Sequence, residues 1–365
     1  MQYIDLKTEY QLLKSEIDAA MAQVMSSGSF IMGPEVAQCE AKLADLAGMK
    51  YCNANASGTT ALQLALMALD IGPGDEVITS DFSFMATAET IAILGATPVF
   101  VDIDPLTYNI DPALIAAAIT PKTKAIIPVD LYGQCADYDA ILAIANARNI
   151  PVIADSAQSI GATYKGKPAG SFGLISCTSF YPTKPLGCYG DGGACFTDDD
   201  ALAIKLSKLR NHGDRSRYEH EMIGINGRFD TLQAAVLLVK LKYFNESLNA
   251  RARVAALYNS RLNEIGLAPF ISEHNTSVYA QYTIRVANRD LVQAHLKSKN
   301  IPTCVHYPRP LHAQPAFALD KMPVNPHALK ASREVLSLPF HLFLTEDDVE
   351  MVCEQLSCVV GAAEV

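Results

Sequence analysis

The chain has 365 residues, of which 50% are hydrophobic and 19% are charged. This length predicts two domains or one large domain with a sizeable core, and the composition excludes a disordered chain or a small disulfide-held scaffold. Lys and Arg total 29 against 39 Asp and Glu, which gives a formal net charge of −10, and the basic residues are scattered. A nucleic acid is therefore not an expected partner.

The sequence also argues against a membrane or secreted protein. Its most apolar stretch, residues 91–101, is interrupted by Gly95, Thr97 and Pro98 and is far shorter than the ~20 residues that span a bilayer. The N-terminus lacks the basic and apolar regions of a secretory signal. The sequence has nine cysteines, and none of them form a CxxC pair. We therefore expect buried thiols in a reducing compartment and no metal site. We expect a soluble, cytoplasmic protein.

Between Lys50 and Thr197, short apolar runs alternate with helical patterns. This alternation is typical of βαβ units and of a largely parallel sheet whose strands are buried on both faces. The expected strands are residues 76–80, 98–104, 124–132, 151–156, 174–180 and 192–197. Residues 59–70 and 136–149 place apolar side chains three and four positions apart, which predicts crossover helices.

After Phe229 the pattern changes, because residues 230–265 are typical of one long helix or two abutting helices and contain no expected strand. Further elements are expected at 279–286 as a strand and at 289–299 and 346–356 as helices. We therefore predict an α/β fold with a large domain at residues 1–245, built on a mostly parallel sheet, and a small α+β C-terminal domain at residues 246–365.

Parallel α/β sheets bind ligands at the carboxyl ends of their strands, so reactive residues at those positions are candidates for a site. The first such segment is ASGTTAL at 56–62, where a strand end is followed at once by a helix start. The free amides of Gly58 and Thr59, the Thr59 hydroxyl and the helix dipole suit a phosphate. An ordinary Ser or Thr helix cap is the alternative.

Two further candidates follow expected strands. Phe84 comes after the strand at 76–80, where an aromatic side chain can cover a flat ring or simply pack in the core. Asp155 ends the strand at 151–156, where a carboxylate can keep a ligand's ring nitrogen protonated, and Gln158 would lie on the same face of the helix expected to follow. A helix-capping role is the alternative for Asp155.

Lys184 lies in a turn flanked by Pro182 and Pro185, between the strand at 174–180 and a Gly-rich return. Most lysines are solvated at the surface, which is the alternative here. A lysine held beside apolar strands loses hydration, and the resulting fall in its pKa is what an amine nucleophile needs.

The order of these features is more informative than any one of them. A phosphate-type loop, an aromatic residue, a strand-end Asp with Gln three positions on, and Ser179 with Lys184 five positions later form the arrangement of a pyridoxal phosphate site. A nicotinamide-dependent dehydrogenase would need GxGxxG after its first strand, whereas the Gly cluster at 187–193 leads into a strand.

With these motifs, the sequence resembles the DegT/StrS family of nucleotide-sugar aminotransferases, which have the aspartate aminotransferase-like pyridoxal phosphate fold. The resemblance runs from YIDLKTEY through SGTTALQLAL, GPGDEVIT, DSAQSIGA, TSFYPTKPLG and GRFDTLQAA to VHYPRPLH, and it is most specific in YGQCADYDAI and CTSFYPTKPLGCYGDGGA.

Carried over residue by residue, the resemblance implies two catalytic residues. Lys184 would hold the cofactor covalently and transfer the proton, and Asp155 would pair with the pyridinium nitrogen. The other implied contacts to the cofactor are Gln158 at the ring hydroxyl, Phe84 against the ring, and Gly58, Thr59 and Ser179 at the phosphate. Asn226 would cross the dimer interface and contact the phosphate of the cofactor that is bound to the partner subunit. The implied sugar-nucleotide residues are Gly28, Phe30, Thr183, Arg228, His306 and Tyr307.

The resemblance also implies a homodimer that transfers an amino group from L-glutamate to a keto-sugar nucleotide, with pyridoxamine phosphate as the intermediate cofactor form. The pattern is closest to members acting on UDP-2-acetamido-2-deoxy-3-oxo-glucuronate in O-antigen synthesis, where Arg228 or His306 would meet the substrate carboxylate. A 4-keto UDP- or dTDP-hexose is the alternative substrate. A sugar dehydratase of the family has His in place of Lys184, and an inactive regulatory relative is disfavoured by the intact catalytic set.

Overall fold

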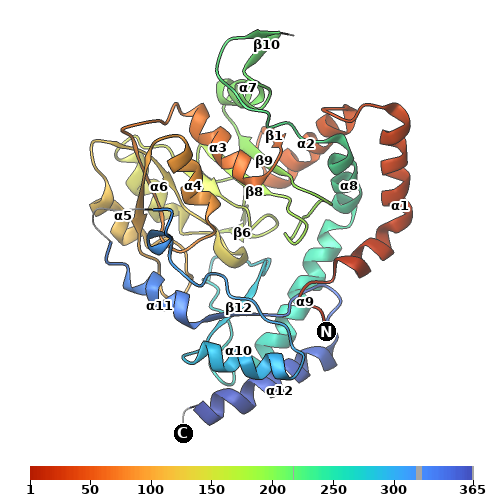
Figure 1. Ribbon diagram of the computed structural model, residues 1–365, viewed down its shortest axis with the longest axis vertical. Coiled ribbons are helices and arrows are strands. Elements are labelled where there is room, and N and C mark those ends of the chain that lie inside the picture. The colour runs from red at the N-terminus through yellow and green to blue at the C-terminus, as the bar shows by residue number, and fades with distance from the viewer. Residues whose placement is uncertain (217, 318–322, 364–365) are drawn as a thin grey trace.

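The computed structural model describes residues 1–216, 218–317 and 323–363 and has a central sheet between two layers of helices (Figure 1). Its strands are β1 (Tyr51–Asn55), β2 (Glu76–Ser80), β3 (Thr97–Val101), β4 (Thr123–Ile127), β5 (Ile153–Asp155), β8 (Ile175–Ser179) and β9 (Gly193–Thr197). The ladder β3–β2–β4 continues into the ladder β5–β8–β9–β1, because parallel bridges join Ile126 to Val152 and Val129 to Asp155.

The predicted strands and the mostly parallel sheet are confirmed. Strand β2 runs parallel to β3 and β4, and β5 runs parallel to β8, whereas β9 is antiparallel to both of its neighbours. Strand β4 is shorter than predicted. Pro128 follows its last residue, Ile127, and has no N–H to extend a ladder.

Alternate strand residues face different helices, as expected for a sheet that is buried on both faces. Val77, Ile127 and Ile153 belong to the core formed with α3 (Gly58–Ala68), α4 (Ala86–Ile93) and α7 (Asp200–Leu209). Their neighbours Ile78 and Ile126 belong to the core on the other face, with α5 (Pro112–Ala118) and α6 (Tyr138–Asn146). Helices α3 and α6 confirm the predicted crossover helices.

The long helical stretch after Phe229 is two abutting helices, α8 (Thr231–Lys242) and α9 (Phe244–Leu262). Helix α8 packs against α1 (Leu6–Ser27) through Ile17, Val236 and Val239 and beside α2 (Pro34–Ala47). In Figure 1, α8 and α9 run down one side of the molecule toward the C-terminal elements.

The C-terminal part has its own core, in which residues 254–262 of α9 pack with later elements. Strand β12 (Tyr282–Arg285) pairs antiparallel with β13 (Val335–Leu338). The helices there are α10 (Arg289–Ser298), α11 (Pro326–Glu334) and α12 (Glu346–Ala363). The domain division at residue 245 stays a prediction, and it falls at the start of α9.

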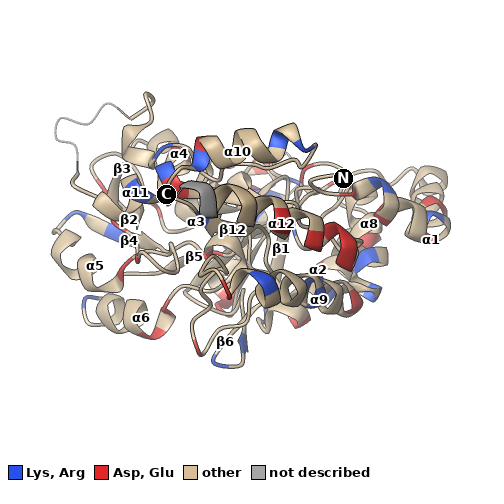
Figure 2. Ribbon diagram, turned by 90° about the horizontal axis from the view of Figure 1, so that it is seen from below, with Lys and Arg blue, Asp and Glu red and all other residues tan. Residues whose placement is uncertain are grey.

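Short hairpins complete the chain, namely β6 (Thr163–Tyr164) with β7 (Lys167–Pro168) and β10 (Asp214–Ser216) with β11 (Glu219–His220). Figure 2 shows basic and acidic residues interspersed along the helices, α9 and α10 among them. Within the described ranges, no helix combines the length and apolarity that crossing a bilayer requires.

Candidate active site

A cavity of about 540 Å³ lies where the carboxyl ends of β2, β4, β5 and β8 meet the start of α3. Most of the predicted site residues line it, although they are far apart in the sequence. They are Gly58, Thr59, Phe84, Asp155, Gln158, Ser179, Thr183, Lys184, His306 and Tyr307. The central sheet brings all of these except His306 and Tyr307 together, because its parallel strands end at this edge.

Lys184 extends into this cavity from the Pro-flanked turn after β8. The turn is closed by the Lys184 amide, which donates to the carbonyl oxygen of Tyr181 at 2.8 Å. Burial lowers the pKa of the Lys184 amine to about 8, and the charge of Asp155 opposes that fall. Within the described residues its amine has no hydrogen bond or ion pair, so it is available to react.

Asp155 ends β5 and is 4% exposed. The Thr87 hydroxyl donates to Oδ2 of Asp155 at 2.8 Å, and the Ala157 amide donates to Oδ1 at 3.2 Å. Burial raises the pKa of Asp155, while these two donors and the charge of Lys184 favour the carboxylate. A cationic ring nitrogen would compensate for the burial of this carboxylate.

One local prediction is wrong. The residues after Asp155 form consecutive turns and not a helix, so Gln158 does not share a helical face with Asp155 and Asp155 caps no helix. Gln158 is instead held by its amide. Its Oε1 accepts from the Tyr132 amide at 2.9 Å, and its Nε2 donates to the Tyr307 hydroxyl at 3.2 Å.

The start of α3 is built to receive an anion. Ser57 is the N-cap, and its hydroxyl accepts from the Thr60 amide at 3.0 Å. The capping alternative therefore applies to Ser57 and leaves the amides of Gly58 and Thr59 without partners in the described chain. A Cβ on Gly58 would lie 2.7 Å from that of Ser179, so only glycine lets these segments approach.

His306 and Tyr307 reach the cavity from the C-terminal part of the chain. His306 Nδ1 lies 2.8 Å from the Ser337 hydroxyl, and its carbonyl accepts from the Tyr132 hydroxyl. Burial, reinforced by the charge of Lys184, lowers the pKa of His306 to about 4. His306 is therefore neutral at neutral pH and offers no positive charge to a carboxylate.

Four predicted residues lie outside this cavity, on two loops that touch each other. Gly28 caps the end of α1 with a φ of 69°, and Phe30 is 43% exposed. An antiparallel bridge joins Ile31 to Asp230, next to the loop that holds Asn226 and Arg228. Nε of Arg228 donates to Oδ1 of Asn226 at 3.0 Å.

Comparison with known proteins identifies the chain. A profile of the DegT/DnrJ/EryC1/StrS aminotransferase family matches residues 11–357. The UDP-2-acetamido-2-deoxy-3-oxo-D-glucuronate aminotransferase of Pseudomonas aeruginosa is 54% identical, over 98% of this chain and 99% of its own. The chain belongs to the DegT/DnrJ/EryC1/StrS aminotransferase family. It is thus a sugar aminotransferase that depends on pyridoxal phosphate, as the resemblance implied.

Solved structures agree with this assignment and with the predicted fold. A family aminotransferase from Brucella abortus superposes with a TM-score of 0.96 at 42% identity, covering 99% of this chain and all of the other. NtdA from Bacillus subtilis, with bound cofactor PMP, superposes with a TM-score of 0.88 at 34% identity, covering 96% of this chain and 82% of its own.

The cavity of this aminotransferase has the donors that its cofactor needs. The free amides at the start of α3 suit the phosphate, the buried carboxylate of Asp155 suits a protonated pyridine nitrogen, and the unpaired amine of Lys184 suits an aldehyde. The residues therefore fit pyridoxal phosphate in both charge and chemistry.

Thr87 and Gln281 are among the cavity residues that the sequence analysis did not identify. Thr87 donates to Asp155 but lies in α4, 68 positions earlier, and no local pattern links them. Gln281 precedes β12 and lines the cavity, and its buried Oε1 has no partner among the described residues. Gln281 lies in the segment 279–286, for which the sequence analysis predicted only a strand.

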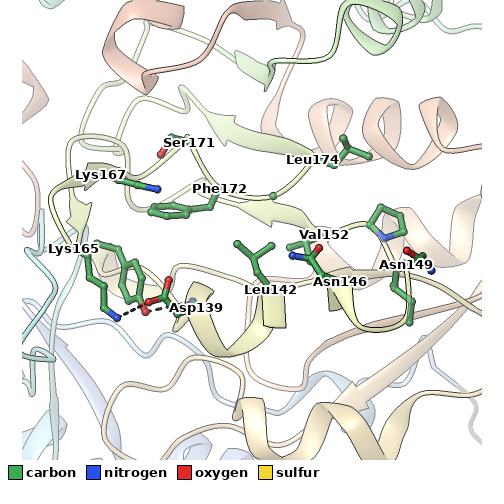
Figure 3. A pocket seen from close by; sticks show the side chains of 14 residues that line it. Asp139, Leu142, Asn146, Asn149, Val152, Lys165, Lys167, Ser171, Phe172 and Leu174 are labelled. Carbon is green, nitrogen blue, oxygen red and sulfur yellow. Dashed lines mark hydrogen bonds and ion pairs between the residues drawn. The ribbon is translucent and has the colours of Figure 1, made fainter. Parts of the chain in front are cut away.

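A larger cavity, of about 960 Å³, lies between α6 and residues 164–174 (Figure 3). Leu142, Val152 and Phe172 lie along it, and at one end Lys165 pairs with Asp139. It contains none of the predicted site residues.

Proposed function

We propose that this enzyme transfers the amino group of L-glutamate to C3 of UDP-2-acetamido-2-deoxy-3-oxo-D-glucuronate, for the synthesis of O-antigen or another surface polysaccharide. The observation that carries the proposal is the single cavity in which the unpaired Lys184 amine and the buried Asp155 carboxylate lie with an anion-binding helix start. The 3-oxo glucuronate is the substrate of the Pseudomonas aeruginosa relative.

In this mechanism Lys184 holds the cofactor at rest and then acts as the base. When bound, pyridoxal phosphate supplies an electron sink for the transfer of the amino group. The released Lys184 amine takes the proton from the α-carbon of the donor and delivers it to C4′ of the cofactor. In the second half-reaction the same amine would move a proton in the opposite direction. The kinetics should be ping-pong, because 2-oxoglutarate leaves before the keto sugar reacts.

Asp155 keeps the pyridine nitrogen protonated throughout. Its carboxylate is preorganised because Thr87 and Ala157 fix both oxygens before any ligand binds. Gln158 would bind the ring hydroxyl, Phe84 would cover the ring, and Gly58, Thr59 and Ser179 would hold the phosphate.

The carboxylate of the sugar is assigned to Arg228. Of the two groups that the sequence offered, His306 is neutral at neutral pH because of its lowered pKa. Arg228 is partly exposed and engages only Nε with Asn226, with no ion pair in the described chain. Its terminal nitrogens are free for a bidentate carboxylate. Gly28, Phe30, Thr183 and Tyr307 complete the sugar-nucleotide site.

The active enzyme is proposed to be a cytoplasmic homodimer with shared sites. Asn226 and Arg228 do not line the cavity of their own chain, which suits residues that serve a partner. All nine cysteines are free thiols, which fits a reducing compartment.

The test is an assay with matched substrates. We expect UDP-2-acetamido-2-deoxy-3-oxo-D-glucuronate and L-glutamate to give 2-oxoglutarate and the 3-amino sugar, at a kcat/KM at least about tenfold above that of the same nucleotide sugar with CH₂OH in place of the carboxylate. An Arg228→Ala variant should lose this preference. If a UDP- or dTDP-linked 4-keto hexose is turned over faster than the 3-oxo glucuronate, the proposed substrate is wrong.

A further inference from the structure

Asp130 is a fully buried carboxylate that lies behind the cavity without lining it. It follows β4 and lies two residues before the motif YGQCADYDAI, whose high specificity the proposed reaction does not explain. Four donors hold its side chain. They are the Ala136 amide at 2.9 Å and the Tyr138 hydroxyl at 2.8 Å on Oδ1, and the hydroxyls of Ser156 at 3.0 Å and Ser159 at 2.8 Å on Oδ2.

The two oxygens serve different parts of the molecule. Oδ1 binds the segment that leads into α6, and Tyr138 is packed in the core beneath that helix. Oδ2 binds two serines that lie directly beside the cavity residues, since Ser156 follows Asp155 and Ser159 follows Gln158. The first oxygen therefore supports the fold, and the second supports the loop that carries the cofactor contacts.

This loop depends on side-chain bonds for its shape. Residues 157–161 are turns, so no ladder of helical hydrogen bonds holds them. The main chain next to Asp130 adds two further links to the same loop. The Asp130 amide donates to the Asp155 carbonyl at 3.0 Å, and the Tyr132 amide donates to Gln158 Oε1 at 2.9 Å.

We propose that Asp130 is a positioning residue, which fixes Asp155 and Gln158 against the cofactor through its Oδ2 bonds to Ser156 and Ser159. This inference rests on the proposed roles of Asp155 and Gln158. Burial raises the pKa of Asp130 to about 6, and the four donors oppose that rise because they stabilise the carboxylate. A charged acceptor holds hydroxyl donors more firmly than a neutral one does.

The experiment compares the two oxygens. Ser159→Ala removes one bond to Oδ2, and Tyr138→Phe removes one bond to Oδ1 of the same carboxylate. Asp130→Asn removes the negative charge and weakens the hydrogen bonds to both oxygens. For each folded apoenzyme, the Kd of pyridoxamine phosphate is measured by fluorescence titration, together with the visible absorbance of bound pyridoxal phosphate, kcat, KM and the melting temperature.

We expect Asp130→Asn to raise the Kd of pyridoxamine phosphate about tenfold and Ser159→Ala about threefold, since each loses hydrogen bonds to a charged group. Both variants should shift the absorbance of the bound cofactor and lower kcat, while KM for the sugar nucleotide changes less than about twofold. Tyr138→Phe should lower the melting temperature without altering the Kd or the absorbance.

The inference is overturned if Ser159→Ala and Tyr138→Phe differ from wild type only in melting temperature, because Asp130 then serves the core alone. Should Asp130→Asn fail to fold, the pair Ser159→Ala and Tyr138→Phe still decides the question. A wild-type protein that does not bind pyridoxamine phosphate overturns the proposed function and this inference together, and is recognised before any variant is made.

Discussion

The predicted site residues fall into two regions that differ in what holds them. Lys184 and Asp155 follow strands of the central sheet and meet in one cavity, since the sheet fixes where its strands end. Gly28, Phe30, Asn226 and Arg228 lie on exposed or partly exposed loops outside that cavity. One chain thus assembles the proposed cofactor region by itself, whereas in the proposed dimer a partner subunit would complete the second region.

The surface around the second region bears on the proposed dimer. Phe30 is 43% exposed, Ile31 49% and Met32 36%, although all three are apolar and adjacent. The loop that holds them is fixed in place, because the Thr231 amide donates to the Phe30 carbonyl at 2.9 Å. Ordered, exposed apolar side chains are typical of a protein interface, which supports the proposed dimer.

The largest effect is expected at the centre of the first region. Lys184→Ala should abolish turnover and leave the fold intact, because no second amine of the described residues lines the cavity. Borohydride reduction of the loaded wild-type enzyme, followed by mass spectrometry, should place the pyridoxyl adduct on the peptide that contains Lys184. Lys165→Ala is the control, since Lys165 pairs with Asp139 at the larger cavity. An adduct on Lys165 or Lys167 would contradict the assignment.

Asp155→Asn is expected to bind the cofactor but to lose about three orders of magnitude in kcat, because an amide cannot keep the pyridine nitrogen protonated. The substitution preserves volume and can still accept from Thr87, so the melting temperature should change little. Single-turnover kinetics with L-glutamate measure the loss in the first half-reaction alone. Activity near that of wild type would remove Asp155 from the mechanism.

What could be predicted from the sequence follows the same division. Lys184 and Asp155 were found because each follows an apolar run, and such runs indicate buried strands. The link between Thr87 and Asp155 could not be found, since it joins residues 68 positions apart. The turns after Asp155 were mistaken for a helix because the side-chain bonds of Asp130 that hold them are also long-range. Local sequence patterns therefore predict helices and strands, whereas side-chain contacts between distant helices, strands and loops cannot be recognised in them.

The third prediction tests whether the second region serves a partner. Lys184→Ala and an Asn226→Ala/Arg228→Ala double variant should each have less than about 1% of wild-type activity as pure dimers. Refolded together in equal amounts, half of the dimers are hybrids with one site whose two halves are intact, so about a quarter of wild-type activity should return.

The control mixes Lys184→Ala with Asp155→Asn, whose defects lie in the same half of the site and cannot complement each other. Hybrid dimers should be demonstrated directly by mass spectrometry of differently tagged chains. Stable hybrids without restored activity would mean that Asn226 and Arg228 act within their own chain or not at all.

The smallest expected effect is a shift in a pH profile, and it links Lys184 and Asp155, the two residues proposed as catalytic. Burial lowers the pKa of Lys184 from 10.5 to about 8, while the charge of Asp155 raises it. The neutral amine is the nucleophile, so the rate at which apoenzyme takes up pyridoxal phosphate should rise about tenfold per pH unit below 8 and level off above it.

In Asp155→Asn the opposing charge is gone, and the pH at which the rate levels off should be lower than in the wild type. Stopped-flow absorbance between about pH 6 and 10 measures both profiles. A shift to higher pH, or none, would mean that Asp155 does not act on the Lys184 amine across the cavity.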